Sequence, residues 1–209
     1  MKILVTGCFG FIGLNFIEHV SKKNPKIKIV GIDCITYASN KKYINKFINL
    51  RNFKFYKVNI NSKKINDIII KEKPLKIINF AAESHVDNSI TKPDKFIKSN
   101  INGVFNLLYY SNLYFQKLDT NLKKKFIFLQ VSTDEVFGSV TNISAKENSK
   151  YNPSSPYSAS KASADHLVNA WKVTYNFPVI ITHTCNNYGP YQNKEKFIPK
   201  IIMCLLKNS

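Results

Sequence analysis

Two adjacent carboxylates, Asp134 and Glu135, lie in the stretch STDEVFG of residues 132–138, which directly follows the apolar run KFIFLQV of residues 125–131. The chain holds 13 acidic and 31 basic residues, so neighbouring acids at the end of an apolar run are unusual. Ligands of parallel-sheet proteins bind beyond the carboxyl ends of the strands, so this pair is expected to face a substrate. Two such groups can remove a C–H proton and protonate a leaving hydroxyl, which together eliminate water. The structural alternative is a helix-capping aspartate beside a surface glutamate.

A tyrosine and a lysine lie four residues apart in the stretch YSASK, as Tyr157 and Lys161. This spacing places both side chains on one face of a helix. A phenol, with a pKa of about 10, needs nearby positive charge to act as a base at neutral pH. The pair is therefore a candidate for removing a hydroxyl proton during hydride transfer, with Thr133 as a polar neighbour. The alternative is a surface pair in a lysine-rich chain.

Three glycines, Gly7, Gly10 and Gly13, lie in the stretch TGCFGFIG between an apolar run and a helical pattern. Glycines at such a turn allow a pyrophosphate to approach the backbone and the start of the helix. Asp33 follows 20 residues after Gly13, at the end of the next apolar run. A carboxylate there binds ribose hydroxyls and repels a 2′-phosphate, which favours NAD over NADP. The alternative is an ordinary structural turn.

Apolar runs alternate with helical patterns along the chain, which predicts an α/β fold with a Rossmann-like, doubly wound parallel sheet and helices on both faces. We expect a dinucleotide-binding domain over 1–190 and the start of a substrate-binding portion over 191–209. The expected strands are 2–6, 27–33, 53–59, 76–82, 125–132 and 178–184. The expected helices are 11–23, 63–73, 93–115, 156–175 and 196–208.

Composition bounds the class of protein. The net charge of +18 comes almost entirely from lysine, and the only arginine is Arg51, which argues against a nucleic-acid reader. The apolar content of 44% is that of a globular chain, and no apolar run is long enough to span a bilayer. Cys8, Cys34, Cys185 and Cys204 have no metal-binding or redox spacing. Free thiols and no signal peptide predict a cytoplasmic protein without a bound metal.

Stretches spread over the whole chain resemble the dTDP-glucose 4,6-dehydratases of the extended short-chain dehydrogenase/reductase family. The matching stretches are KILVTGCFGFIG, DCITYASN, FAAESHVDNSI, VSTDEVFG, NPSSPYSASKASADHL and NNYGPYQNKEKFIP. The Asp–Glu pair is the most specific of these features, because sugar epimerases carry a different stretch there. The resemblance implies conversion of dTDP-glucose to dTDP-4-dehydro-6-deoxyglucose with a bound NAD.

The resemblance also implies a role for each catalytic position. Tyr157 would deprotonate the glucose 4-hydroxyl as hydride leaves C4, assisted by Lys161, while Thr133 orients that hydroxyl. Glu135 would then remove the C5 proton, and Asp134 would protonate the departing C6 hydroxyl.

Further positions match cofactor and substrate contacts of the family. The implied cofactor residues are Gly7, Gly10, Phe11, Ile12, Gly13, Asp33, Cys34, Ile35, Thr36, Asn59, Ile60, Phe80, Ala81, Ala82, Glu83, Ser84, Ser99, Tyr157, Lys161 and Asn187. The implied substrate residues are Ser84, Thr133, Asn186, Lys196 and Phe197. His85 is interpreted as a structural neighbour of the strand end and not as a base.

Members of the family continue past the point at which this sequence stops, so we expect a truncated chain that turns over poorly by itself. The alternatives are a UDP-sugar 4,6-dehydratase, a nucleotide-sugar epimerase, and an inactive NAD-binding fragment or one that works beside a second polypeptide. The resemblance further implies a homodimer through the helices 93–115 and 156–175.

Overall fold

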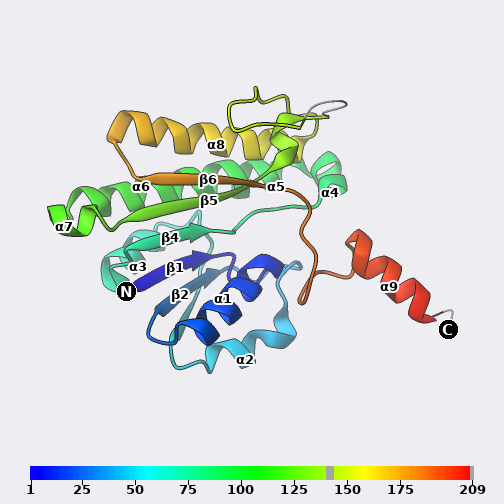
Figure 1. The fold of residues 1–209 in the computed structure, drawn as a ribbon, viewed down its shortest axis with the longest axis horizontal. Helices are drawn as coiled ribbons and strands as arrows, with labels where there is room; N and C mark the ends of the chain where they lie inside the picture. The colour runs from blue at the N-terminus through cyan, green and yellow to red at the C-terminus, as the bar shows by residue number, and fades with distance from the viewer. Residues whose placement is uncertain (140–143, 208–209) are drawn as a thin grey trace.

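Six strands rich in isoleucine, valine and phenylalanine form one parallel sheet in the computed structural model, which describes residues 1–139 and 144–207 (Figure 1). The strands are β1 (Lys2–Thr6), β2 (Lys28–Asp33), β3 (Phe53–Lys57), β4 (Lys76–Asn79), β5 (Ile127–Thr133) and β6 (Val179–Thr184). Their order across the sheet is β3-β2-β1-β4-β5-β6. The chain crosses from one half of the sheet to the other after β3, so the strand order reverses between β1 and β4. Ligands bind at this point in such folds.

Helices connect successive strands and cover both faces of the sheet. They are α1 (Phe11–Lys23), α2 (Ile44–Ile48), α3 (Lys64–Glu72), α4 (Val86–Thr91), α5 (Pro93–Phe96), α6 (Gly103–Gln116), α7 (Thr120–Lys123), α8 (Pro156–Tyr175) and α9 (Phe197–Lys207). Shorter helical turns are η1 (Lys41–Tyr43), η2 (Ile97–Asn102) and η3 (Asp134–Phe137). Described residues include no helix that is both long and apolar enough to cross a membrane.

The core lies in two layers because neighbouring residues of a strand point to opposite faces of the sheet. Val5 of β1 packs with Leu14 and Ile17 of α1 on one face. Leu4 of β1 packs with Leu107 of α6 and helices α3 and α8 on the other face. Each fully buried side chain of this size contributes about 2 kcal/mol of transfer free energy. Packing in the two layers holds the strands in place, and with them the polar residues that follow the strand ends.

The expected Rossmann-like parallel sheet is confirmed, and each expected strand and helix corresponds to an observed element. The expected helix 93–115 is interrupted, because α5 passes through the π-helical turn η2 before α6 begins. Gly103 lies at this junction, where an added Cβ would overlap the side chain of Ile60. Hydrophobic spacing alone did not distinguish this π-helical turn from a regular helix.

The carboxyl-terminal segment leaves the body of the molecule after β6. Among the described residues, strand β6 pairs with β5 alone and forms one edge of the sheet. Helix α9 extends away from the sheet in Figure 1, and none of its described residues is buried. The first residue of α9, Phe197, is 77% exposed.

Candidate active site

A cleft runs across the carboxyl ends of β1 and β4, at the point where the strand order reverses. It consists of two adjoining cavities of about 270 Å³ and 460 Å³. The cavities share five lining residues, namely Gly7, Gly10, Ala38, Phe80 and Ala82. We call the smaller one the ribose cavity, because Asp33 lines it, and the larger one the catalytic cavity, because Tyr157 lines it.

The glycine turn forms the floor that the two cavities share. Gly7 has a φ of 63°, and a Cβ on it would lie 2.7 Å from the backbone nitrogen of Ala81 at the end of β4. A Cβ on Gly13 would overlap the carbonyl oxygen of Gly7. Gly10 caps α1 without a side-chain hydrogen bond, so the first N–H groups of the helix are left for an anionic ligand.

Asp33 ends β2 and holds two loops around the ribose cavity. Its Oδ2 accepts from the backbone N–H of Phe9 at 3.0 Å. Its Oδ1 accepts from the backbone N–H of Ile35 at 2.7 Å and from Ser39 Oγ at 3.0 Å. The carboxylate therefore has a fixed position, and Asp33 lines the cavity.

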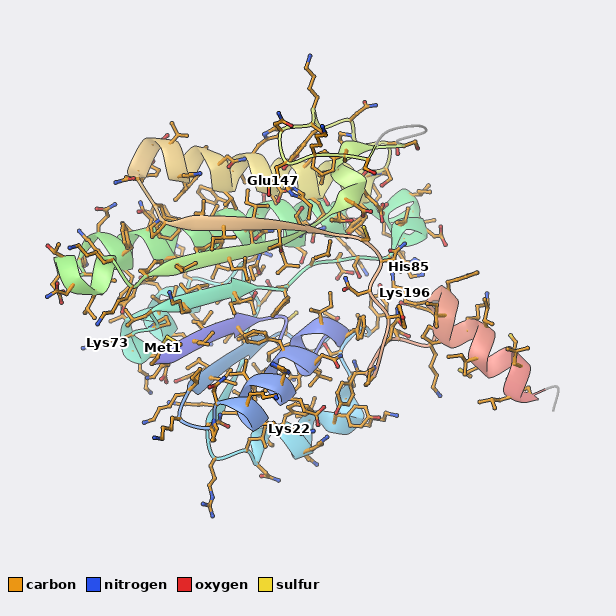
Figure 2. All side chains as sticks on the ribbon, viewed as in Figure 1. Met1, Lys22, Lys73, His85, Glu147 and Lys196 are labelled. Carbon is orange, nitrogen blue, oxygen red and sulfur yellow. The ribbon has the colours of Figure 1, made fainter. Side chains whose placement is uncertain are left out.

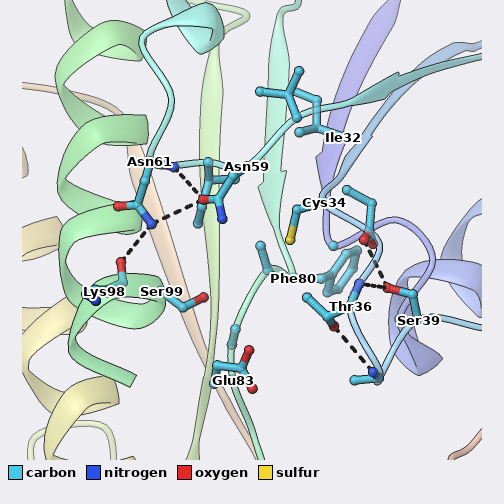
Figure 3. A pocket seen from close by; sticks show the side chains of 18 of the residues that line it. Ile32, Cys34, Thr36, Ser39, Asn59, Asn61, Phe80, Glu83, Lys98 and Ser99 are labelled. Carbon is cyan, nitrogen blue, oxygen red and sulfur yellow. Dashed lines mark hydrogen bonds between the residues drawn. The ribbon is translucent and has the colours of Figure 1, made fainter. Parts of the chain in front are cut away.

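The far wall of the ribose cavity is built by the segment after β3 (Figure 3). Asn59 Oδ1 accepts from the backbone N–H of Asn61 at 2.9 Å, so its amide nitrogen is the group left for other contacts. On the β4 side, Asn100 Oδ1 accepts from the backbone N–H of Glu83 at 2.9 Å, and its Nδ2 donates to Ser160 Oγ at 2.9 Å. These bonds tie the loop after β4 to helix α8.

Helix α8 presents the tyrosine and the lysine to the catalytic cavity. Ser155 caps the helix: its Oγ accepts from the backbone N–H of Ser158 at 3.0 Å, and Ser158 Oγ accepts from the backbone N–H of Ser155 at 3.0 Å. Tyr157 therefore lies in the first turn, where it is 9% exposed, and Lys161 lies one turn further along.

The carboxylate pair forms the tight turn η3 at the end of β5. Thr133 Oγ1 accepts from the backbone N–H of Glu135 at 3.2 Å, which starts this turn. Thr133, Glu135 and Tyr157 all line the catalytic cavity, and the hydroxyl groups of Thr133 and Tyr157 are hydrogen-bonded. A phenol, a threonine hydroxyl and a carboxylate thus face one space.

Burial and negative charge dominate the protonation of this group. Burial raises the pKa of Tyr157 to about 12, and the negative charges of Glu135 and Asp134 add to that shift. Burial also raises the pKa of Glu135, with Asp134 adding to the effect and Lys196 opposing it. In the absence of a cationic ligand the tyrosine is therefore a phenol, so the phenolate expected from the Tyr–Lys spacing needs a further positive charge beside it.

Lys161 is almost completely buried, with 4% of its surface exposed. Its Nζ donates to the carbonyl oxygen of Val131 at 2.7 Å. Burial lowers the pKa of Lys161 to about 8, while the charge of Asp165 acts in the opposite direction. The ammonium group is thus easily deprotonated, which is unusual for a lysine.

Asp134 lies beside the catalytic cavity without lining it. Thr133 Oγ1 donates to Asp134 Oδ1 at 3.3 Å, and Cys185 at the end of β6 also hydrogen-bonds to this carboxylate. Both Thr133 and Cys185 line the cavity. Asp134 is therefore one side chain removed from the space that Glu135 faces.

The mouth of the catalytic cavity is formed where the loop after β4 meets the segment before α9 (Figure 2). Lys196 Nζ donates to the carbonyl oxygen of Ser84 at 3.2 Å, and His85 Nε2 lies 4.0 Å from a carboxylate oxygen of Glu195. His85 does not line either cavity, in keeping with its interpretation as a structural neighbour.

The structure brings nearly all of the expected cofactor and substrate residues to the two cavities. Ile35 and Phe197 are the exceptions: Ile35 lies in the turn held by Asp33, and Phe197 is at the exposed start of α9. Several other lining residues were not expected from the sequence, and they include Tyr37, Asn61, Val86, Lys95, Lys98, Gln192, Asn193 and Glu195. Val86, Lys95 and Lys98 lie in short helical segments and the others in loops, and no spacing in the sequence distinguishes them. Within 1–139 and 144–207, no group of three or more His, Cys, Asp or Glu side chains could hold a metal ion.

The sequence model of the family described as GDP-mannose 4,6 dehydratase matches residues 4–209. The dTDP-glucose 4,6-dehydratase of Salmonella typhimurium is 43% identical over 218 residues, which cover 99% of this chain and 60% of that protein. The dTDP-glucose 4,6-dehydratase of Haemophilus influenzae is 44% identical over 205 residues, which cover 97% of this chain and 60% of that protein. The chain thus spans about 60% of the length of these curated relatives.

Solved structures of similar proteins superpose on the entire chain. The dTDP-glucose 4,6-dehydratase of Bacillus anthracis, in complex with NAD, gives a TM-score of 0.86 at 36% identity, over 100% of this chain and 62% of that one. The dTDP-glucose 4,6-dehydratase of Streptomyces venezuelae, with NAD and a second ligand bound, gives 0.88 at 34% identity, over 100% and 63%.

Proposed function

The chain belongs to the GDP-mannose 4,6-dehydratase family, and we propose that it forms the cofactor-binding and catalytic part of an NAD-dependent dTDP-glucose 4,6-dehydratase. The observation that carries this proposal is the convergence of Tyr157, Thr133 and Glu135 on one cavity next to the glycine turn. An enzyme that only transfers hydride does not need the carboxylate, whereas an elimination does. The curated relatives and the similar structures support dTDP-glucose as the substrate.

The residues of the cleft fit a dinucleotide. The backbone around Gly7 and Gly13 leaves no room for a Cβ, and the uncapped start of α1 offers N–H groups to a pyrophosphate. Asp33 would bind the adenosine ribose, and Lys161 would bind the nicotinamide ribose. Because a fixed carboxylate repels a 2′-phosphate, NAD is favoured over NADP.

The chemistry divides among four side chains. The redox chemistry would be supplied by NAD held at the glycine turn, Asp33 and Lys161: hydride would leave C4 and return to C6 as C5 regains a proton. Tyr157 removes the proton of the 4-hydroxyl, which Thr133 orients. The C5–H becomes acidic once C4 is a carbonyl, and Glu135 removes that proton. Asp134, which lies one side chain outside the cavity, would supply the proton for the 6-hydroxyl through the hydroxyl of Thr133, so that water leaves and a C5–C6 double bond forms.

The electrostatics of the cavity are consistent with these roles. The raised pKa of Glu135 makes this carboxylate a stronger base than a solvated one. The phenol of Tyr157 becomes a usable base when the positive charge of an oxidised nicotinamide is placed beside it. Lys196 at the mouth is a suitable cation for the diphosphate of the substrate.

The test is a comparison of dTDP-glucose with UDP-glucose in single-turnover reactions of the chain with NAD. The 4-keto product is measured by its alkaline absorbance, and the near-ultraviolet absorbance of reduced nicotinamide reports the first hydride transfer. We expect dTDP-glucose to give both signals, but slowly, because the chain spans only about 60% of the length of its relatives. Glu135→Gln should still give reduced nicotinamide but lose product by about 100-fold, because the oxidation precedes the proton removal.

Glu147→Gln is the matched control, since Glu147 is an exposed glutamate in the loop before α8 (Figure 2). Product formation by Glu135→Gln at the rate of the control would exclude elimination through this carboxylate. A signal with UDP-glucose alone would reassign the nucleotide. NAD binding with neither signal would make the chain an NAD-binding unit without turnover of its own.

We further propose that the chain pairs with a second copy through α6 and α8. Phe105, Tyr109 and Leu113 are exposed at a spacing of four residues on α6, which forms an apolar stripe on one face. Phe105 packs edge-on against Trp171 of α8, with 5.8 Å between the ring centroids. Sedimentation of Tyr109→Glu should show a smaller species than the unmodified chain if this face is the interface.

A further inference from the structure

Side chains of helix α8 form hydrogen bonds to three consecutive residues at the end of β5. Lys161 Nζ donates to the carbonyl oxygen of Val131 at 2.7 Å. The hydroxyl of Tyr157 is hydrogen-bonded to Thr133, two residues further along the strand. The catalytic helix and the strand that leads into the carboxylate pair are thus fixed to each other by their own functional side chains.

The residue between these two contacts is held by a side chain to which the proposed mechanism gives no role. Ser132 Oγ donates to Asp165 Oδ2 at 2.6 Å. Asp165 lies four residues after Lys161 and eight after Tyr157, so a helix places the three side chains in one row. Asp165 is 0% exposed, which is rare for a carboxylate.

Asp165 also connects two further segments. His183 of β6 places Nε2 3.3 Å from Asp165 Oδ2, and Tyr151 of the loop before α8 donates its hydroxyl to the same oxygen at 3.4 Å. The hydroxyl of Tyr151 and His183 Nε2 are 2.8 Å apart. The other oxygen, Oδ1, is buried without a hydrogen-bond partner among the described residues. One carboxylate therefore joins α8, β5, β6 and the preceding loop.

A buried charge at Asp165 destabilises the folded chain, so its presence suggests a role for the charge. A buried carboxylate loses hydration that three polar contacts at one oxygen only partly replace. A neutral amide has nearly the same shape and could accept the same hydrogen bonds through its oxygen. A negative charge in this position does, however, favour the charged form of the buried ammonium one turn away.

We propose that Asp165 is a positioning residue that keeps Lys161 in its ammonium form and fixes the end of β5 beneath the catalytic cavity. This inference rests on the proposed function, because the ammonium matters through its contacts with the cofactor and with the field at Tyr157. Asp165 itself does not line either cavity, so it acts through Lys161 and Ser132.

The direction of the charge effect agrees with this role. The charge of Asp165 raises the pKa of Lys161, against a lowering by burial that leaves it at about 8. In return, Lys161 lowers the pKa of Asp165, which burial raises. Other titratable groups surround the pair from each neighbouring element, and these are Tyr157 on α8, Asp134 and Glu135 in η3, Tyr151 in the loop, and His183 on β6.

The direct test is an NMR titration of Lys161 in chain grown with isotope-labelled lysine. We expect its midpoint near pH 8 in the unmodified chain and about one pH unit lower in Asp165→Asn. Asp165→Glu keeps the charge and should restore the midpoint. Asp67→Asn is the matched control, because Asp67 is exposed on α3 and its loss should leave Lys161 unchanged.

A second readout is the pH dependence of the NAD dissociation constant. If the ammonium of Lys161 is needed for binding, affinity falls about tenfold per pH unit above its midpoint. The onset of that fall should move to lower pH in Asp165→Asn and return in Asp165→Glu. A residue that served only as packing would lower affinity equally at every pH.

A third measurement needs no substitution, so the proposal can be tested even if Asp165→Asn does not fold. The carboxyl carbon resonance of Asp165 in the unmodified chain should show an inflection at the Lys161 midpoint, because interacting groups titrate together. A missing inflection, or a folded Asp165→Asn whose Lys161 titrates like that of the control, overturns the proposal. None of these readouts needs substrate, so they remain valid if the dehydration assay fails.

Discussion

Tyr157 and Lys161 are both buried, and burial moves their protonation in opposite directions. It raises the pKa of the phenol to about 12 and lowers the pKa of the ammonium to about 8, because each neutral form is the easier one to desolvate. Burial therefore disfavours the charged form of both residues, which is the phenolate of Tyr157 and the ammonium of Lys161. A cationic ring beside Tyr157 would favour the phenolate, and the charge of Asp165 already favours the ammonium of Lys161.

Lys161 should reduce the stability of the folded chain at neutral pH. Its pKa is about 8 when folded and 10.5 for an ordinary lysine, so the unfolded chain binds more protons between these values. Stability from this group therefore rises with pH from about 8 to 10.5, and its full cost is present below pH 8.

The substitution Lys161→Met should accordingly raise the unfolding free energy by about 2 kcal/mol at pH 7, with no gain above pH 10.5. Urea denaturation at neutral and strongly alkaline pH measures both values. Lys172→Met, an exposed position on the same helix, serves as control and should change little at either pH. A loss of stability at neutral pH in Lys161→Met would show that its bond to Val131 outweighs the desolvation.

The elements that carry the site are joined at short turns whose geometry excludes most side chains. Helix α1 begins directly after the glycine turn, and Gly10 N donates to Gly7 O at 3.0 Å. The turn η3 ends at Gly138, whose φ is 74° and whose added Cβ would overlap the carbonyl oxygen of Asn152. Small changes at such turns should therefore move whole elements.

Gly13→Ala should cost about 2 kcal/mol or more of unfolding free energy, because its Cβ would overlap the Gly7 carbonyl inside a closed turn. Gly10→Ala is the matched variant: its Cβ would lie 3.2 Å from the same oxygen, so a loss below about 1 kcal/mol is expected. Chemical denaturation of both variants measures the difference. Equal losses would mean that the turn yields around residue 13.

Apolar side chains are exposed on the edge strand of the sheet and on the last helix. Ile180 of the edge strand β6 is exposed, and so are Ile201, Ile202 and Leu205 of α9. Exposed apolar patches of this kind bind other surfaces. We expect them to lower solubility, in addition to the effect of the apolar stripe on α6.

Replacing two of these residues, in Ile202→Lys with Leu205→Lys, should reduce the binding of a hydrophobic dye by about twofold and lessen concentration-dependent light scattering. Val173→Lys, at an exposed valine on α8, is the control for added charge. If the control lowers both signals equally, the effect comes from net charge and not from α9.

The sequence by itself predicted the fold class, the glycine turn and the pairing of the tyrosine with the lysine. The alternation of apolar runs and helical patterns specifies a parallel sheet because each strand must be buried on both faces. Gly7, Gly10 and Gly13 indicate the turn before α1, where a Cβ on Gly7 or Gly13 would overlap the backbone, and Tyr157 and Lys161 share a face because the helical repeat requires it. These features depend on neighbours within a few residues, so the sequence contains them.

The tertiary structure decided what depends on residues far apart in the chain. Asp165 became notable only when folding placed it against Ser132 and His183, and Asn100 only when folding placed it against Glu83. The position of Asp134 one side chain outside the cavity also follows from the packing of β5 against β6. The burial of a side chain and the charge around it depend on every element that surrounds it. A local pattern of residues therefore cannot predict either of them.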